Sequence, residues 1–141
     1  TSPENKKFLR DLQYQIRLEN LKHDILFVHG SPRKINEYLY EDRPKATFER
    51  IAKVAGTDVL LFGHTHLPYQ KNVSGVLFVN CGSVGKPKDG NPNAGYVILA
   101  LGRKVEVEFI RVPYDIRAAA KAIRDSDLAD EFAEMLEKGM G

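Results

Sequence analysis

The chain has 141 residues, 43% of them hydrophobic, and its 21 Lys and Arg residues against 19 Asp and Glu residues give a formal net charge of +2. This composition is typical of one globular domain, and the charge is too small to indicate nucleic acid or a membrane surface as a partner. No apolar run approaches the roughly 20 residues that cross a membrane. Cys81 is the single cysteine, so no internal disulfide can form, and we expect a reducing, cytoplasmic setting.

The first part of the chain predicts a helix followed by two strands. Residues 1–12 favour a short helix capped by Thr1 or Ser2, because proline in the first turn suits a helix start. Residues 15–19 alternate apolar and polar side chains, which indicates a strand with one exposed face. Residues 21–28 end in a continuous apolar run and predict a buried strand.

A β-α-β unit is predicted next. A loop rich in tyrosine and charge, residues 31–43, leads to a helix that Pro44 opens and Gly56 ends. The expected core stripe of this helix is Phe48, Ile51, Ala52 and Ala55. Residues 59–62 form another short apolar strand, so we expect it to run parallel to the strand at residues 21–28.

The second half predicts two β-hairpins. Residues 69–73 and 76–80 flank the dipeptide Ser-Gly, a plausible hairpin turn. A loop rich in Gly, Pro and Asn then spans residues 81–95. Residues 96–101 are apolar enough for a central strand, and residues 105–109 alternate as a strand with one wet face does.

Two helices are predicted at the end of the chain. One begins at Asp115, with an inward face formed by Ile116, Ala119, Ala120 and Ile123. The other begins near Asp127 and stops at Gly139, with an inward face formed by Leu128, Phe132, Met135 and Leu136. Acidic residues at the start of the last helix and a lysine at its end complement the helix dipole.

Three histidines follow the buried strands. His29 comes directly after residues 21–28, and His64 and His66 belong to the sequence Gly-His-Thr-His after residues 59–62. Because the carboxyl ends of parallel strands meet at one edge of an α/β sheet, we expect the three imidazoles at that edge. In an extended segment, two side chains two residues apart point to the same side and could reach one centre or two adjacent ones. Imidazole binds transition metals well, so the pattern predicts a metal site. His23 enters its strand from the opposite end and is expected to be structural.

The segments that carry these histidines resemble the calcineurin-like metallophosphoesterases, especially the small bacterial and archaeal phosphodiesterase-type members. The similar segments are residues 28–32 (Val-His-Gly-Ser-Pro), 62–68 (Phe-Gly-His-Thr-His-Leu-Pro), 80–90 and 111–115. The resemblance implies an α/β fold. The chain would be the carboxyl-terminal portion of a four-layer α-β-β-α sandwich with mixed β-sheets.

The resemblance also implies a chemistry. Members of the family hold two divalent transition-metal ions and hydrolyse phosphomonoesters or phosphodiesters with a metal-activated hydroxide. By this likeness, His29 and His64 would bind one metal and His66 the other, the metal being Mn, Fe, Ni or Zn. Two such ions can hold the phosphoryl oxygens and stabilise the leaving oxygen. The expected substrate is a small phosphoester.

The other metal-binding segments of the family do not occur in this sequence. It has no Asp-x-His, Gly-Asp-x-x-Asp or Gly-Asn-His segment, and Asp24, Asp58 and Asp89 do not match those patterns. Since the sequence also starts at Thr1, we expect residues 1–141 to be a single domain without the amino-terminal half of the fold. That half of the same protein would be the partner, and no catalytic residue is expected in this chain itself. An uncovered apolar sheet face would favour self-association into a homo-oligomer.

A glycine-containing loop follows the last of the similar strands. The run Gly-Ser-Val-Gly-Lys that ends at Lys86 superficially suggests a phosphate loop, but Asn80 replaces the required first glycine and Pro87 follows the lysine. We expect a tight loop in which Lys86 or Lys88 attracts the negative charge of the substrate. Cys81 stands where the family usually has proline and is expected to be a small buried filler.

Two alternatives to a binuclear phosphoesterase stay open. His29, His64 and His66 alone would suit a mononuclear zinc enzyme with an open fourth position. A non-catalytic protein-interaction scaffold of the same fold would also suit an incomplete metal site. Metal stoichiometry separates the two enzyme interpretations, whereas the sequence does not identify the substrate.

Overall fold

The computed structural model describes residues 1–19 and 22–141. In chain order, its elements are α1 (Pro3–Asp11), β1 (Gln15–Glu19), β2 (Asp24–Val28), α2 (Lys45–Ala55), β3 (Val59–Phe62), β4 (Tyr69–Val73), β5 (Val76–Asn80), β6 (Ala94–Leu101), β7 (Val105–Val112), α3 (Ile116–Arg124) and α4 (Glu131–Lys138). Five strands form one sheet in the order β1-β2-β3-β5-β4, and β6 and β7 pair as a two-stranded sheet.

The five-stranded sheet is mixed, as expected for the α/β class. β2 and β3 run parallel, and so do β3 and β5. β1 pairs antiparallel with β2, and β4 pairs antiparallel with β5. The predicted parallel pairing across the β-α-β unit is therefore confirmed, and it places the carboxyl ends of β2, β3 and β5 at one edge.

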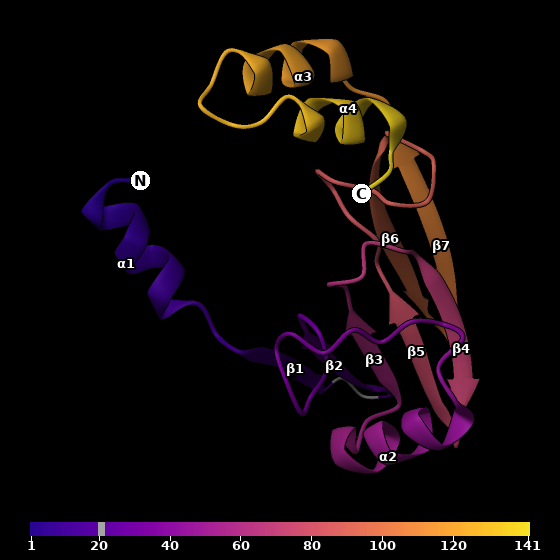
Figure 1. The fold of residues 1–141 in the computed structure, drawn as a ribbon. Helices are drawn as coiled ribbons and strands as arrows, with labels where there is room; N and C mark the ends of the chain where they lie inside the picture. The colour runs from indigo at the N-terminus through magenta and orange to yellow at the C-terminus, as the bar shows by residue number, and fades with distance from the viewer. Residues whose placement is uncertain (20–21) are drawn as a thin grey trace.

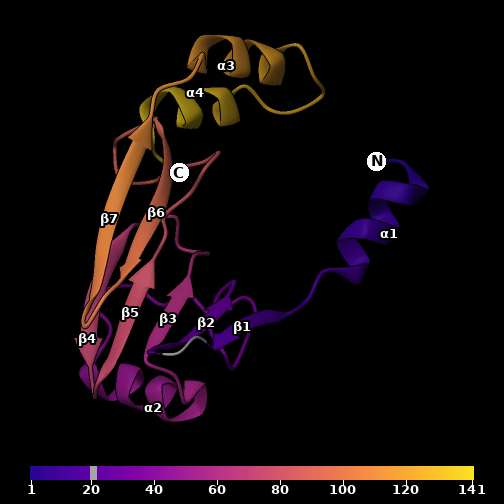
Figure 2. The same ribbon diagram turned by 180° about the vertical axis from the view of Figure 1, so that it is seen from behind.

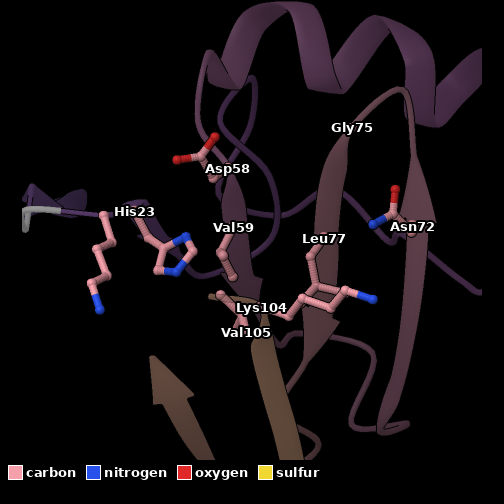
Figure 3. A pocket seen from close by; sticks show the side chains of 9 residues that line it. His23, Asp58, Val59, Asn72, Gly75, Leu77, Lys104 and Val105 are labelled. Carbon is pink, nitrogen blue, oxygen red and sulfur yellow. The ribbon is translucent and has the colours of Figure 1, made fainter. Parts of the chain in front are cut away.

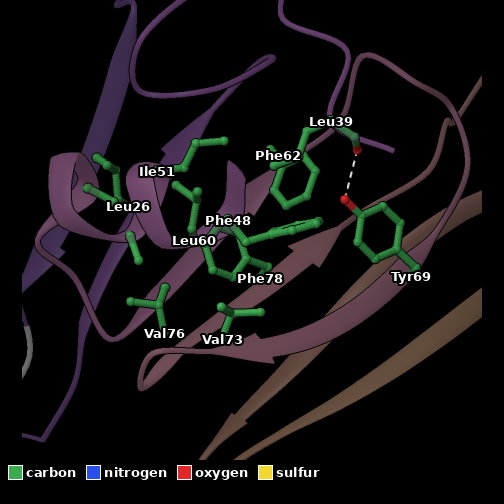
Figure 4. Packing of buried hydrophobic residues seen from close by; sticks show 12 residues of the cluster. Leu26, Leu39, Phe48, Ile51, Leu60, Phe62, Tyr69, Val73, Val76 and Phe78 are labelled. Atoms are coloured by element: carbon green, nitrogen blue, oxygen red, sulfur yellow. Dashed lines mark hydrogen bonds between the residues drawn. The ribbon is translucent and has the colours of Figure 1, made fainter. Parts of the chain in front are cut away.

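One face of this sheet packs against α2. Leu60 of β3 and Phe78 of β5 lie in the cluster that this helix covers (Figure 4). The rings of Phe48 and Phe78 meet edge to face, with centroids 5.1 Å apart. The inward residues of α2 are those that the sequence predicts, namely Phe48, Ile51, Ala52 and Ala55.

The opposite face packs against the β6–β7 hairpin. Leu61 of β3 and Val79 of β5 belong to a second buried cluster, on which Val97, Leu99, Val105 and Val107 of the hairpin are packed. Figures 1 and 2 show the hairpin running along the sheet on the side away from α2. β3 is thus covered on both faces, and all four of its residues are buried.

The predicted central position of the strand at residues 96–101 is wrong for the described part of the chain. There β6 pairs only with β7, because these two strands form a separate hairpin layer. Half-exposed and exposed side chains alternate along most of β6, as they do on a strand whose one face is uncovered.

Two turns form as their residues predict. α2 ends at Gly56, which adopts the left-handed conformation with φ of 52°. Between β4 and β5, Ser74 and Gly75 have φ values of 53° and 81°. Two successive positive φ angles are the requirement of a tight type I′ hairpin turn, so the predicted hairpin is confirmed.

Two predicted boundaries need correction. The strand predicted at residues 21–28 starts at Asp24, and Leu21 lies outside the described residues. The last helix begins at Glu131 and not near Asp127, because the hydroxyl of Ser126 accepts the backbone N–H of Leu128 and forms a turn instead. Leu128 is consequently exposed, and Ala133 takes a buried place on the helix.

α1 stands apart from the layers (Figure 1). Its cap is the predicted one, since the hydroxyl of Ser2 accepts the backbone N–H of Asn5 at 3.2 Å. None of its residues is buried, and the large apolar side chains of Phe8 and Leu12 are exposed. Among the helices that the structure describes, none has the length and apolar character that crossing a membrane requires.

Candidate metal centre

His29 and His64 meet at the carboxyl ends of β2 and β3. The backbone carbonyl of His29 accepts the N–H of Gly63 at 2.8 Å, which continues the parallel pairing beyond the strands. Nε2 of His29 lies 2.9 Å from Nδ1 of His64, and the two ring centroids are 4.9 Å apart. We call the edge that carries His29, His64 and His66 the histidine edge.

This spacing fits a shared divalent metal ion. A histidine nitrogen binds zinc at about 2.0–2.1 Å, so two nitrogens at right angles on one ion lie roughly 3 Å apart. The two facing nitrogens of His29 and His64 are at nearly this distance. The pair therefore fits one cation, to which it would supply two ligands.

The Gly-His-Thr-His segment is a tight turn. The N–H of Thr65 bonds the carbonyl of Gly63 at 2.7 Å. His64 and His66 have φ values of 64° and 61°, in the left-handed region that few residues other than glycine adopt. The prediction that these two side chains extend from a strand-like segment is therefore wrong. Backbone strain of this kind persists only where surrounding contacts over-determine it, and it gathers at functional sites.

Asn80, at the end of β5, holds this turn in place. It is fully buried, and its side-chain amide donates to the hydroxyl of Thr65 at 2.8 Å and to the carbonyl of Gly63 at 3.1 Å. Its side-chain oxygen accepts the N–H of Gly82 at 2.9 Å. Sequence reasoning missed this residue as a site component. The sequence feature that could have identified it is a polar residue at the end of an apolar strand, because a polar side chain buried there needs a hydrogen-bond partner.

His66 is oriented by the loop after β5. Its Nδ1 lies 2.6 Å from the carbonyl oxygen of Lys86. Because a carbonyl only accepts hydrogen bonds, Nδ1 must carry the proton, and the free electron pair is on Nε2. A histidine that ligates a metal through one nitrogen commonly donates its other N–H to a carbonyl in this way, so His66 also fits a metal.

The three histidines do not form a closed group. Within residues 1–19 and 22–141, no three His, Cys, Asp or Glu side chains gather closely enough to hold a metal together. The described contacts join His29 to His64 and His66 to the Lys86 carbonyl.

The local electrostatics favour neutral His64. Burial lowers the pKa of His64 most, and the neighbouring His29 and His66 lower it further, with a smaller effect from Lys88. A histidine must be neutral to bind a metal, so the lowered pKa of His64 suits the ligand role predicted for it. The effect of Lys88 also shows that its positive charge acts at the histidine edge.

The carboxyl-terminal helices support the Lys86 loop. The ammonium group of Lys86 lies 5.2 Å from the ring centroid of Phe132, in α4. The carbonyl of Gly139, just after α4, accepts the N–H of Gly90 at 2.9 Å. The side chain of Lys86, predicted to attract the substrate, is thus turned toward α4, and the backbone carbonyl of Lys86 contacts His66.

Cys81 and His23, which the sequence predicts to be structural, lie outside the histidine contacts described above. Cys81 is partly exposed and packs beside the second buried cluster, and burial raises the pKa of its thiol. His23 lies near the other end of β3, in a hollow of about 530 Å³ that Asp58 and Lys104 also line (Figure 3). A ring nitrogen of His23 is 2.9 Å from the carbonyl oxygen of Gly102, a contact that supports its structural interpretation.

Comparison of the sequence with models of known protein families shows to which family the chain belongs. Residues 2–104 match the family model described as the calcineurin-like phosphoesterase superfamily domain. The chain belongs to this superfamily. The predicted resemblance is therefore confirmed.

Three similar proteins illustrate the membership in the phosphoesterase superfamily. A metallophosphoesterase structure from Sphaerobacter thermophilus is 28% identical with a TM-score of 0.82, and the match covers 99% of this chain and 64% of that one. An uncharacterized protein of Methanocaldococcus jannaschii is 32% identical over 94% of this chain and 59% of its own length. The phosphodiesterase YfcE of Escherichia coli is 43% identical over a shorter segment, 36% of this chain and 27% of its own. The chain spans less than two thirds of each.

Proposed function

We propose that this chain supplies part of a binuclear metal site of a phosphoesterase, in which His29 and His64 hold one divalent ion and His66 holds the other. The observation that carries the proposal is the 2.9 Å contact between the facing nitrogens of His29 and His64. The orientation of His66 by the Lys86 carbonyl supports the second part. Membership in the calcineurin-like phosphoesterase superfamily supports the reaction class.

The chain contributes ligands and charge to this chemistry. Bound divalent ions would polarise a phosphoryl oxygen and lower the pKa of a bound water. Neutral imidazoles leave the positive charge of such ions uncompensated, so an anionic phosphoester is attracted to the histidine edge. Lys88 adds positive charge there. Imidazole ligands suit Mn, Fe, Ni and Zn, and we propose one of these metals.

We further propose that residues 1–141 form one domain together with protein outside these residues. The similar proteins are longer than this chain, which spans 59% of the Methanocaldococcus jannaschii relative. A pair of dications held close together needs carboxylate ligands as well as neutral ones, and no such cluster occurs among the described residues. The missing ligands would come from the additional protein.

The test uses the complete natural protein. We expect two transition-metal ions per chain and hydrolysis of bis(p-nitrophenyl) phosphate that EDTA abolishes. His64→Ala should lower the activity about 100-fold or more, because it removes a ligand outright. His23→Ala, at the other end of β3, is the matched control and should retain the wild-type rate.

Other outcomes separate the alternatives. One zinc ion per chain without phosphodiester hydrolysis would favour the mononuclear three-histidine enzyme. A protein that binds no metal and hydrolyses no phosphoester would favour the non-catalytic scaffold. Either result would overturn the proposed function.

A further inference from the structure

Four aromatic rings follow one another from the histidine edge outward. The centroids of His29 and His64 are 4.9 Å apart, and the ring of Tyr38 lies 4.2 Å from that of His64. Tyr40 stacks on Tyr38 with a centroid distance of 5.8 Å and an interplanar angle of 17°. We call Tyr38 and Tyr40 the tyrosine pair. The tyrosine pair therefore lies directly beside the candidate metal centre, with Tyr38 in contact with His64.

The backbone between the two tyrosines is firmly anchored. Leu39 is only 1% exposed and belongs to the cluster under α2. Its carbonyl accepts the hydroxyl of the buried Tyr69 at 2.7 Å (Figure 4). A loop residue fixed in this way leaves its two neighbours little freedom, so the tyrosine pair is held beside His64.

A second anchor lies just before the tyrosine pair. The carboxylate of Glu37 accepts hydrogen bonds from the hydroxyl of Ser31 and from the guanidinium of Arg33. The Ser31 hydroxyl also accepts the backbone N–H groups of Arg33 and Lys34, each at 3.1 Å. These bonds hold residues 31–37 together as a compact loop, and Leu39 attaches the end of that loop to the body of the domain.

The rings themselves remain open to solvent. Tyr38 is 46% exposed and Tyr40 is 37% exposed, whereas Leu39 between them is buried. A rigid backbone that presents two exposed aromatic rings offers contact area at little cost in conformational entropy. The position of these rings, next to a site for an anionic phosphoester, indicates what they would contact.

We propose that the tyrosine pair stacks against a planar aromatic group carried by the phosphoester, either a nucleobase or a simple aryl group. The proposal rests on the proposed function, since the phosphate would be held at the histidine edge. Stacking on an aromatic side chain tolerates different bases, because every base has a π-face. It therefore sets a substrate class, aromatic over purely alkyl phosphoesters, and no particular base.

Binding can be measured without turnover. Isothermal titration calorimetry of the metal-loaded complete protein would compare AMP, phenyl phosphate and ribose 5-phosphate. We expect AMP or phenyl phosphate to bind about tenfold more tightly than ribose 5-phosphate. Tyr40→Ala should remove this preference, and Tyr40→Phe should restore it because the ring is kept. Tyr96→Ala, an exposed tyrosine on β6, is the matched control and should keep the preference.

Comparing AMP with phenyl phosphate shows whether the tyrosine pair prefers a nucleobase or accepts any aryl group. Tighter binding of AMP alone indicates a nucleobase, and equal binding of AMP and phenyl phosphate indicates any aryl group. Equal affinities for AMP, phenyl phosphate and ribose 5-phosphate would overturn the inference. So would a preference for aromatic ligands that Tyr40→Ala leaves intact.

Activity gives an independent measurement. The ratio of kcat/KM for bis(p-nitrophenyl) phosphate over glycerophosphoethanolamine should fall about tenfold in Tyr40→Ala, with an unchanged melting temperature. An unchanged ratio combined with a lowered melting temperature would make the tyrosine pair structural and overturn the inference. Failure of the wild-type protein to hydrolyse any phosphoester would instead overturn the proposed function, while the calorimetric comparison still decides the stacking.

Discussion

The side-chain amide of Asn80 donates a 2.8 Å hydrogen bond to the hydroxyl of Thr65, and the two residues are 0% and 2% exposed. This bond joins the end of β5 to the strained turn that carries His64 and His66. Both histidines have positive φ, so the turn needs support from outside its own residues. The position of two proposed metal ligands thus depends on a buried amide 14 or more residues away in sequence.

Replacing this amide should destabilise the protein. Asn80→Ala removes the donor to the Thr65 hydroxyl and the Gly63 carbonyl and leaves the N–H of Gly82 without its acceptor, and a buried group left unsatisfied costs about 1–3 kcal/mol. We expect the free energy of unfolding in urea to fall by about 1–3 kcal/mol. Asn72→Ala, an exposed asparagine on β4, is the control and should change it by less than about 0.5 kcal/mol. Equal effects of the two substitutions would show that the bond is unimportant.

Gly30 should not tolerate a side chain. A Cβ atom at this position would lie 2.5 Å from the carbonyl oxygen of Ile35 and 2.8 Å from the backbone N of Glu37. Since both neighbours are backbone atoms, Gly30→Ala must displace the loop or the adjacent His29, at a cost of about 1–3 kcal/mol. Gly85→Ala meets no atom within 4 Å and is the control. Thermal unfolding of both variants checks the prediction, and a Gly30→Ala protein as stable as the control would contradict it.

The Glu37 anchor makes stability depend on pH. Burial raises the pKa of Glu37, but hydrogen bonds from Arg33 and Ser31 and the charge of Lys34 outweigh it, so its pKa lies below the ordinary 4.5. A lowered folded-state pKa contributes stability above pH 4.5 that is lost as the pH falls toward the folded-state value.

Urea unfolding at a series of pH values from about 7 down to about 3.5 would measure this contribution, because ordinary carboxyl groups titrate near the lower end of that series. The stability advantage of the wild type over Glu37→Gln should be constant near neutral pH and shrink below pH 4.5. Glu41→Gln, on the same loop and exposed, is the control. An advantage that stays constant down to the lowest pH would contradict the prediction.

The contact between Lys86 and Phe132 should influence the binding affinity of only one of the two proposed metal ions, the one at His66. Phe132→Ala removes the ring below the Lys86 ammonium and loosens the loop whose carbonyl orients His66. A cation–π contact near the surface is worth about 0.5–1 kcal/mol, so we expect about two- to fivefold weaker binding of one metal ion. Leu128→Ala, an exposed residue before α4, is the control. Stepwise metal titration of the complete protein checks this, and equal weakening at both positions would contradict it.

The sequence predicts most of the fold because its strands and helices follow simple burial patterns. β3 is apolar throughout since both of its faces are covered, and α2 shows the spacing of a one-sided core stripe. The histidine edge follows from the same logic, because parallel strands place His29 and His64 side by side.

What the sequence does not predict depends on contacts between distant residues. The spacing of His64 and His66 suggests an extended segment, whereas the actual turn depends on bonds from Asn80 and on the contact of His66 with the Lys86 carbonyl. The start of α4 is moved by the Ser126 turn, which competes locally with helix formation. The cation–π contact of Lys86 requires α4 to dock on a loop 46 residues earlier in the chain.

Anomalous diffraction from manganese-loaded crystals of the complete protein tests the proposed metal centre most directly. We expect two anomalous peaks in each chain. One should be coordinated by His29 and His64 together, and the other by His66. A single peak coordinated by all three histidines, or no peak at any of them, would rule out the proposed metal centre.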